Sequence, residues 1–352
     1  MASTEKALGT AVIGCGRISR SHLAAINHNP QLARLVAVVD ENEVLRTRAA
    51  ADYGSQLALS SVDEVLAHDE VEAVVICLPN DLHAPVALAA ARAGKHVLVE
   101  KPMATSAADA LAMAEAASAA NITLAVAQCR RHFRAIQALN ERRTEFGELI
   151  SVQVSLGVKW HAPQADWWRD PVRADSLVVA LNGPHVLDFV HMMMGELPLR
   201  VSCESARRQE FWGGADEAMI LLSYPGDRLA SVHLSFNQDP LEDRKVLVFE
   251  KGTAVVEQDR RLLFNGEVLV EPGSDEGRHY LDEAIEFSRQ FEEFVRAVRG
   301  QNNRSVLAHE GVAVIQTLEA AILANKTHHV VHLEPADGAS VNEAAQPKRK
   351  SA

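Results

Sequence analysis

The sequence predicts an α/β domain with a doubly wound parallel sheet, followed by an α+β domain with an open, mostly antiparallel sheet. Three observations lead to this fold class. Short apolar runs alternate with helical segments in the N-terminal third, a glycine turn follows the first of these runs, and from residue 149 apolar residues recur at every second position. We expect residues 1–130 to form the first domain, 131–333 the second, and 334–352 a disordered tail.

Composition limits the kind of protein this is. The 352 residues are 47% hydrophobic and carry a net charge of −12, which argues against nucleic acid or an anionic membrane surface as a partner. The start of the chain has no apolar signal-like segment, so we expect a soluble cytoplasmic protein. The four cysteines form no CxxC pair and no HExxH motif occurs, so we expect reduced thiols and no metal site.

The first apolar run, residues 10–13, leads into Gly14, Gly16, Arg17, Ile18 and Ser19. This is a GxGxxG pattern with Ser19 in place of the third glycine. The first glycine permits the tight turn, the second lets a pyrophosphate approach the backbone, and the third position only has to be small. A helix over residues 18–28 would then direct its free N–H groups at a phosphate.

A second buried strand, residues 35–39, ends at Asp40. A carboxylate at this position binds the ribose hydroxyls of a dinucleotide and repels a 2′-phosphate, so it favours NAD over NADP. The alternative is that Asp40 caps a helix that begins near residue 42.

A third strand, residues 71–78, ends at Pro79 and Asn80, with His83 shortly after. The strand ends of a parallel sheet meet at one edge, so these residues are candidates for cofactor contacts. Turn formation and a helix start explain Asn80 and His83 equally well.

The next strand, residues 97–99, ends in Glu100, Lys101 and Pro102. A lysine at this edge points into the crevice where ligands bind, which makes Lys101 a candidate catalytic group. The alternative is a lysine at the sheet edge that points to water. Helices before and after this strand, to residue 93 and over 106–120, and a strand over 122–127 complete the predicted sheet.

The second domain contains strands with alternating polar and apolar residues, and three helices. The strands are expected at 151–156, 218–222, 229–236 and 245–249, and the helices at 184–194, 280–299 and 309–324. Helices on one face leave the other face of the sheet uncovered. We therefore expect a homo-oligomer, a dimer or a tetramer.

Four motifs together resemble the Gfo/Idh/MocA oxidoreductase family: Gly14-Cys15-Gly16, Leu78-Pro79-Asn80, the lead into Glu100-Lys101-Pro102, and Gly183-Pro184-His185-Val186-Leu187-Asp188. The resemblance covers about residues 10–333 and implies a Rossmann domain, a nicotinamide cofactor and oxidation of a secondary hydroxyl on a sugar, inositol or related polyol. It also implies that Lys101 and His185 flank the reacting hydroxyl. The cofactor site is then expected to comprise Gly14, Gly16, Arg17, Ile18, Asp40, Pro79, Asn80, His83, Glu100 and Lys101.

The sequence departs from the family pattern in front of His185. The family usually has Asp, sometimes Asn, four positions earlier, and this chain has Leu181 there, with Asn182 one place off. Asp188 could orient the imidazole, although holding its helix in place is its commoner role. Which of Lys101 and His185 is the base cannot be read from the sequence.

Three of the four tryptophans lie between residues 160 and 168. Tryptophan stacks on sugar faces and arginine binds hydroxyls or anions, so Trp160, Trp168 and Arg169 are candidates for substrate binding, with Asn182, Lys101 and His185. The alternative is a packed loop or a subunit contact. In the family this segment lines the substrate.

The sequence thus predicts an NAD-dependent oxidoreductase acting on a polyol or sugar. Two alternatives stay open: an enzyme acting on a non-sugar carbonyl or dihydrodiol, and a non-catalytic nucleotide-sensing regulator.

Overall fold

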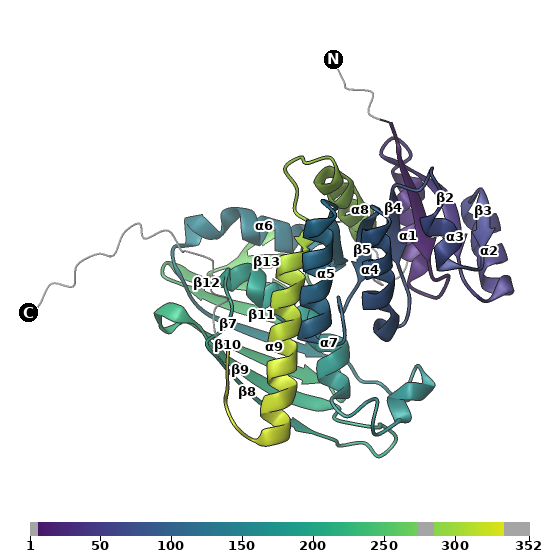
Figure 1. Ribbon diagram of the computed structural model, residues 1–352. Coiled ribbons are helices and arrows are strands. Elements are labelled where there is room, and N and C mark those ends of the chain that lie inside the picture. The colour runs from purple at the N-terminus through teal and green to yellow at the C-terminus, as the bar shows by residue number, and fades with distance from the viewer. Residues whose placement is uncertain (1–5, 274–284, 334–352) are drawn as a thin grey trace, which may run out of the picture.

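The computed structural model describes residues 6–273 and 285–333. Two sheets form the framework, with helices packed on and between them (Figure 1). The expected start of a helix at residue 280 and the tail over 334–352 lie outside the described residues. The predicted fold class, a Rossmann domain followed by an α+β domain, is confirmed.

The first sheet has the strand order β15-β6-β5-β4-β1-β2-β3, and all neighbours except β15 and β6 are parallel. Its inner strands are buried on both faces, as continuous apolar runs require, whereas residues 57–59 at its edge are partly exposed. They are β1 (Leu8–Ile13), β2 (Ala33–Val39), β3 (Leu57–Leu59), β4 (Ala73–Ile76), β5 (His96–Glu100), β6 (Leu124–Ala127) and β15 (Val306–Leu307).

Helices connect the parallel strands. They are α1 (Ser19–His28), α2 (Glu43–Tyr53), α3 (Val62–Leu66), α4 (His83–Arg92) and α5 (Ala107–Ala119), with the short 3₁₀ helix η1 (Asn80–Leu82) before α4. Side chains of Asn42, Ser61 and Ser106 accept backbone N–H groups at the starts of α2, α3 and α5. These caps explain where the three helices begin.

The C-terminal part of the chain returns to the first sheet. Helix α8 (Ile285–Val298) packs on α1, with Phe287, Phe291 and Phe294 buried in the same core, and β15 pairs antiparallel with β6. The predicted division at residue 130 did not anticipate this return, because no local pattern reveals which sheet a short late strand joins.

The second sheet has the order β14-β13-β12-β11-β7-β10-β9-β8-β16 and is antiparallel except between β7 and β10. Its strands are β7 (Leu149–Gly157), β8 (Arg200–Ala206), β9 (Glu217–Ser223), β10 (Leu229–Ser235), β11 (Glu242–Phe249), β12 (Gly252–Glu257), β13 (Arg261–Phe264), β14 (Glu267–Val270) and β16 (Val331–His332). Helices α6 (Arg134–Arg142), α7 (Leu177–Met194) and α9 (Ala308–Thr327) pack against it. Figure 1 shows α9 running past α5 and α7, where the two halves of the molecule meet.

Helix α7 begins at Leu177, not at Pro184 as predicted from the preference of proline for a first helical turn. Pro184 lies inside the helix. Leu177, Val178 and Val179 are buried, and this packing outweighs the hydrogen bond that proline cannot donate. By length and composition α7 could cross a membrane, but 72% of it is buried inside the protein, as expected of a core helix.

Candidate active site

A cavity of about 200 Å³ lies where the glycine turn, the end of β5 and helices α7 and α8 meet. It brings together seven predicted site residues with four that the sequence did not indicate. The lining residues are Arg17, Ile18, Leu78, Asn80, His83, Glu100, Lys101, Ala127, Cys129, His185 and Phe287.

The glycine turn fits a dinucleotide phosphate. Gly14 has φ +94°, and a Cβ there would lie 2.4 Å from the carbonyl oxygen of Cys77, so the position requires glycine. A Cβ at Gly16 would meet nothing within 4 Å, which leaves the backbone open to a ligand. Helix α1 begins without a side-chain cap and without an acidic residue in its first turn. Its N–H groups are therefore available to an anion.

Asp40 lies at the end of β2, beside the glycine turn. Its carboxylate accepts the N–H of Cys15 at 2.8 Å and the N–H of Asn42 at 2.8 Å. The cap of α2 is Asn42, whose side chain accepts from Val44 and Leu45, so Asp40 is not the helix cap itself. Each carboxylate oxygen retains a lone pair for a ribose hydroxyl.

His83 has no exposed surface, and its ring lies between two backbone carbonyls. Nδ1 is 2.8 Å from the oxygen of Pro102, and Nε2 is 2.9 Å from the oxygen of Leu78. Each ring nitrogen thus faces a backbone carbonyl of the protein, and neither is directed at a cofactor. The ring joins the start of α4 to the backbone that follows Lys101. This agrees with the alternative in which His83 serves the turn and the helix start rather than the cofactor.

Lys101 and His185 face the same cavity from β5 and α7. Burial lowers the pKa of Lys101 from its usual 10.5, while the Glu100 carboxylate opposes this shift. Burial, followed by the charges of Lys101, Arg130 and Lys245, holds the pKa of His185 well below 6.5. Nδ1 of His185 has no hydrogen-bond partner among the described residues.

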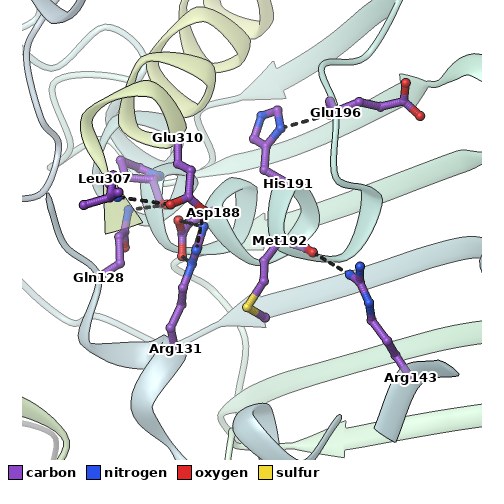
Figure 2. Close-up of polar contacts among 10 residues, drawn as sticks. Gln128, Arg131, Arg143, Asp188, His191, Met192, Glu196, Leu307 and Glu310 are labelled. Carbon is purple, nitrogen blue, oxygen red and sulfur yellow. Dashed lines mark hydrogen bonds and ion pairs between the residues drawn. The ribbon is translucent and has the colours of Figure 1, made fainter. Parts of the chain in front are cut away.

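Asp188 does not orient His185. Its two oxygens accept from Nε and Nη2 of Arg131, each at 2.8 Å, and Nη1 of Arg131 donates to Glu310 at 2.6 Å (Figure 2). The structure confirms the structural alternative for Asp188, because this contact joins α7, α9 and the segment after β6. Leu181 lies one turn before His185 on the same helix, where the family pattern has a carboxylate.

A buried group of four charged residues lies behind the site. Lys245 is 2.7 Å from Asp243 and 2.5 Å from Asp259, and Arg130 forms ion pairs with the same two carboxylates. We call Arg130, Asp243, Lys245 and Asp259 the charged quartet. No pattern in the sequence predicts the quartet, because Arg130 lies more than 100 residues from its two carboxylate partners.

The tryptophans pack against one another. Trp160 and Trp168 make an edge contact at 6.0 Å, and Trp168 also stacks on Phe236 at 6.3 Å. The buried Trp212, which was not predicted, joins this cluster. None of these residues lines the cavity, and neither do Asn182 and Arg169. Arg169 is exposed at the edge of the cluster.

A Rossmann glycine turn and a half-buried lysine and histidine that line one cavity define an NAD(P)-dependent dehydrogenase. Residues 8–128 match the oxidoreductase family with an NAD-binding Rossmann fold, and residues 133–255 match the Gfo/Idh/MocA C-terminal domain. The chain belongs to the Gfo/Idh/MocA oxidoreductase family.

Several known proteins resemble this chain over most of its length. D-xylose 1-dehydrogenase (NADP(+)) 2 of Haloferax volcanii is 29% identical, over 93% of this chain and 98% of that protein. Inositol 2-dehydrogenase of Rhizobium meliloti is 25% identical, over 88% and 94%. The WlbA dehydrogenase of Bordetella pertussis, solved with NADH and UDP-GlcNAcA, superposes with a TM-score of 0.81 at 24% identity, over 94% of this chain and 99% of that one.

Proposed function

We propose that this protein is an NAD-dependent oxidoreductase that interconverts a secondary hydroxyl and a ketone on a sugar, inositol or related polyol. The observation that carries the proposal is the single cavity shared by the Rossmann turn, Lys101 and His185. The relatives named for xylose and inositol support the substrate class.

Oxidation of an alcohol requires a group that removes the hydroxyl proton. When NAD is bound, its nicotinamide supplies the hydride acceptor. Lys101 takes the proton, because its lowered pKa allows a neutral amine and Glu100 stabilises the ammonium that results. His185 stays neutral, because burial and the charges of Arg130 and Lys245 disfavour a protonated ring, and it hydrogen-bonds the same hydroxyl.

The remaining contacts follow from position. Gly14, Gly16, Arg17 and Ile18 bind the pyrophosphate, and Asp40 binds the adenosine ribose and favours NAD over NADP. Pro79 and Asn80 lie at the same sheet edge. Trp160, Trp168, Arg169 and Asn182 form the outer part of the substrate site.

The cytoplasmic location of the protein stays a prediction.

Leu181 favours a second candidate, an enzyme acting on a non-sugar carbonyl or dihydrodiol. The family pattern has a carboxylate here, and its replacement by a side chain that packs against the core fits a different substrate class.

The proposal can be tested by NADH formation with a panel of inositols, aldoses, uronates, glycosides and aryl dihydrodiols. We expect turnover of one polyol class, and a loss of at least 100-fold in kcat for Lys101→Ala with little change in NAD affinity. Lys95→Ala is the control, since that amine bonds the backbone oxygens of His68 and Val71 at the other end of β5. Normal turnover in Lys101→Ala would remove Lys101 from the mechanism, and turnover of aryl dihydrodiols alone would support the second candidate.

A further inference from the structure

Glu100 lies directly before Lys101 and points away from the bulk solvent. The residue is 7% exposed. One carboxylate oxygen, Oε2, accepts the backbone N–H of Lys101 at 3.0 Å, and the other, Oε1, is 2.8 Å from Nε2 of His22. The carboxylate is therefore engaged on both sides within the protein.

His22 comes from α1, one turn after the start of the helix that follows the glycine turn. It has no exposed surface. An ionised carboxylate only accepts hydrogen bonds, so Nε2 of His22 carries the proton that faces Glu100. Nδ1 has no partner among the described residues, and the ring makes an edge contact with Phe287 of α8 at 5.1 Å. The imidazole is thus fixed by packing and by Glu100 alone.

We propose that His22 and Glu100 form a positioning pair that holds the backbone of Lys101 and keeps a negative charge beside its amine. This inference rests on the proposed function, in which Lys101 transfers the proton. A buried carboxylate needs hydrogen-bond donors, and His22 supplies one of them. The pair also links α1 and α8 to the catalytic lysine.

The groups acting on Lys101 come from several elements. They are Glu100 from β5, Cys129 and Arg130 from the turn after β6, and Arg17 from the segment before α1, while His185 faces it from α7. Glu100 is the one carboxylate among them, and the two arginines oppose it. Removing its charge therefore leaves a cationic surrounding that disfavours the ammonium of Lys101.

The test measures the protonation of Lys101 without a substrate. The protein is labelled with trace acetic anhydride across a pH series, and the acetylation of Lys101 is followed by mass spectrometry, since only the neutral amine reacts. We expect the labelling midpoint of Glu100→Gln to lie roughly one pH unit below that of the unaltered protein. His22→Leu should shift it in the same direction, and His22→Gln, which restores a donor, should return it toward the original value.

Glu72→Gln is the matched control. The Glu72 carboxylate also accepts a backbone N–H, that of Gly9 at 2.8 Å, but it does not act on Lys101. Equal midpoints in Glu100→Gln and Glu72→Gln would overturn the proposal. If Glu100→Gln does not fold, equal midpoints in His22→Leu and His22→Gln would overturn it instead. A protein that shows these shifts but oxidises no polyol would contradict the proposed function and leave the pairing intact.

Discussion

At the scale of single residues, the unusual feature is the leucine one turn before His185. A carboxylate at residue 181 would lie N-terminal to the histidine on the same helical face, where it stabilises a protonated ring. We predict that Leu181→Asp raises the pKa of His185 and transfers the proton-accepting role to it. The pH dependence of kcat/KM would then acquire a new ionisation between about pH 5 and 7.

Leu181→Asn provides the control, because it introduces a polar group of similar size without a charge. The same pH profile in both variants would show that position 181 has no influence on the proton transfer. A fall in Tm is expected in both, because Leu181 packs against the core.

Asp40 allows a second prediction at this scale. Asp40→Asn keeps an acceptor for the N–H of Cys15 but removes the negative charge that would repel a 2′-phosphate. We expect the preference for NAD over NADP, measured as a ratio of dissociation constants, to fall roughly tenfold or more. Asp40→Ala should in addition weaken both cofactors, because the glycine turn loses its anchor. An unchanged ratio in Asp40→Asn would mean that the ribose contact lies elsewhere.

At this scale, the sequence indicates candidate site residues but not the side chains that hold them in place. Lys101 and His185 could be proposed as site residues because a strand end and family motifs mark them, and the structure places both in one cavity. The partner of Glu100 could not be predicted from the sequence. His22 lies 78 residues earlier, and only the packing of α1 on the sheet brings the two side chains together. The same holds for His83, where the sequence allows a cofactor contact and the fold encloses both ring nitrogens.

At the scale of elements, α7 and α9 pack against each other beside the site. A Cβ at Gly183 would lie 2.8 Å from Leu318, so glycine lets the helices approach. His191 lies 2.9 Å from the hydroxyl of Thr317, which itself donates to Ala313. The start of α7 was predicted seven residues late because proline marks a local preference, whereas the burial of Leu177 and Val178 depends on the whole domain.

His191 makes the stability of this pair depend on pH. Burial, followed by the charge of Arg131, lowers its pKa from 6.5 to about 4. The unfolded chain therefore binds more protons between pH 6.5 and 4, and the free energy of unfolding decreases as the pH falls through that window. From pH 7 to 5 the contribution of His191 is about 2 kcal/mol.

We predict that His191→Gln, which can still donate to Thr317, loses less stability on acidification than the unaltered protein. The fall in Tm between pH 7 and 5 should be smaller by about 3 °C. The variant His28→Gln, at an exposed histidine, is the control, and its Tm should fall between pH 7 and 5 by as much as that of the unaltered protein. If the Tm of all three proteins falls by the same amount, protonation of His191 does not destabilise the folded state.

At the scale of the whole molecule, buried ion pairs tie the two halves together next to the cavity. Arg130 and Arg131 lie in the turn shortly after β6. Within the charged quartet, Arg130 pairs with the carboxylates from the second sheet, and Arg131 pairs with one carboxylate each of α7 and α9. Lys101 and His185, which come from different halves, are thus held in one cavity. The sequence predicts both domains but not this connection, because long-range charge pairing has no local signature.

The other whole-molecule feature is the face of the second sheet that no helix covers among the described residues. Met219 and Leu221 on β9 are each 61% exposed, and Leu229 on β10 is 56% exposed. The nine strands average six residues, or roughly 20 Å, and lie about 4.8 Å apart, so the face covers roughly 860 Å², close to the roughly 800 Å² that each partner buries in a stable interface. An area of this size agrees with the predicted homo-oligomer.

We predict that Met219→Lys combined with Leu221→Lys dissociates the oligomer, because two buried ammonium groups facing a second copy would have no partners. Size-exclusion chromatography with light scattering should give a mass near the 38.3 kDa of one chain for the double variant and a multiple of it for the unaltered protein. Val44→Lys, at an apolar position of the first domain that is 74% exposed, should keep the larger mass. A single-chain mass for the unaltered protein at micromolar concentration would contradict the prediction. An unchanged larger mass in the double variant would place the interface on another surface.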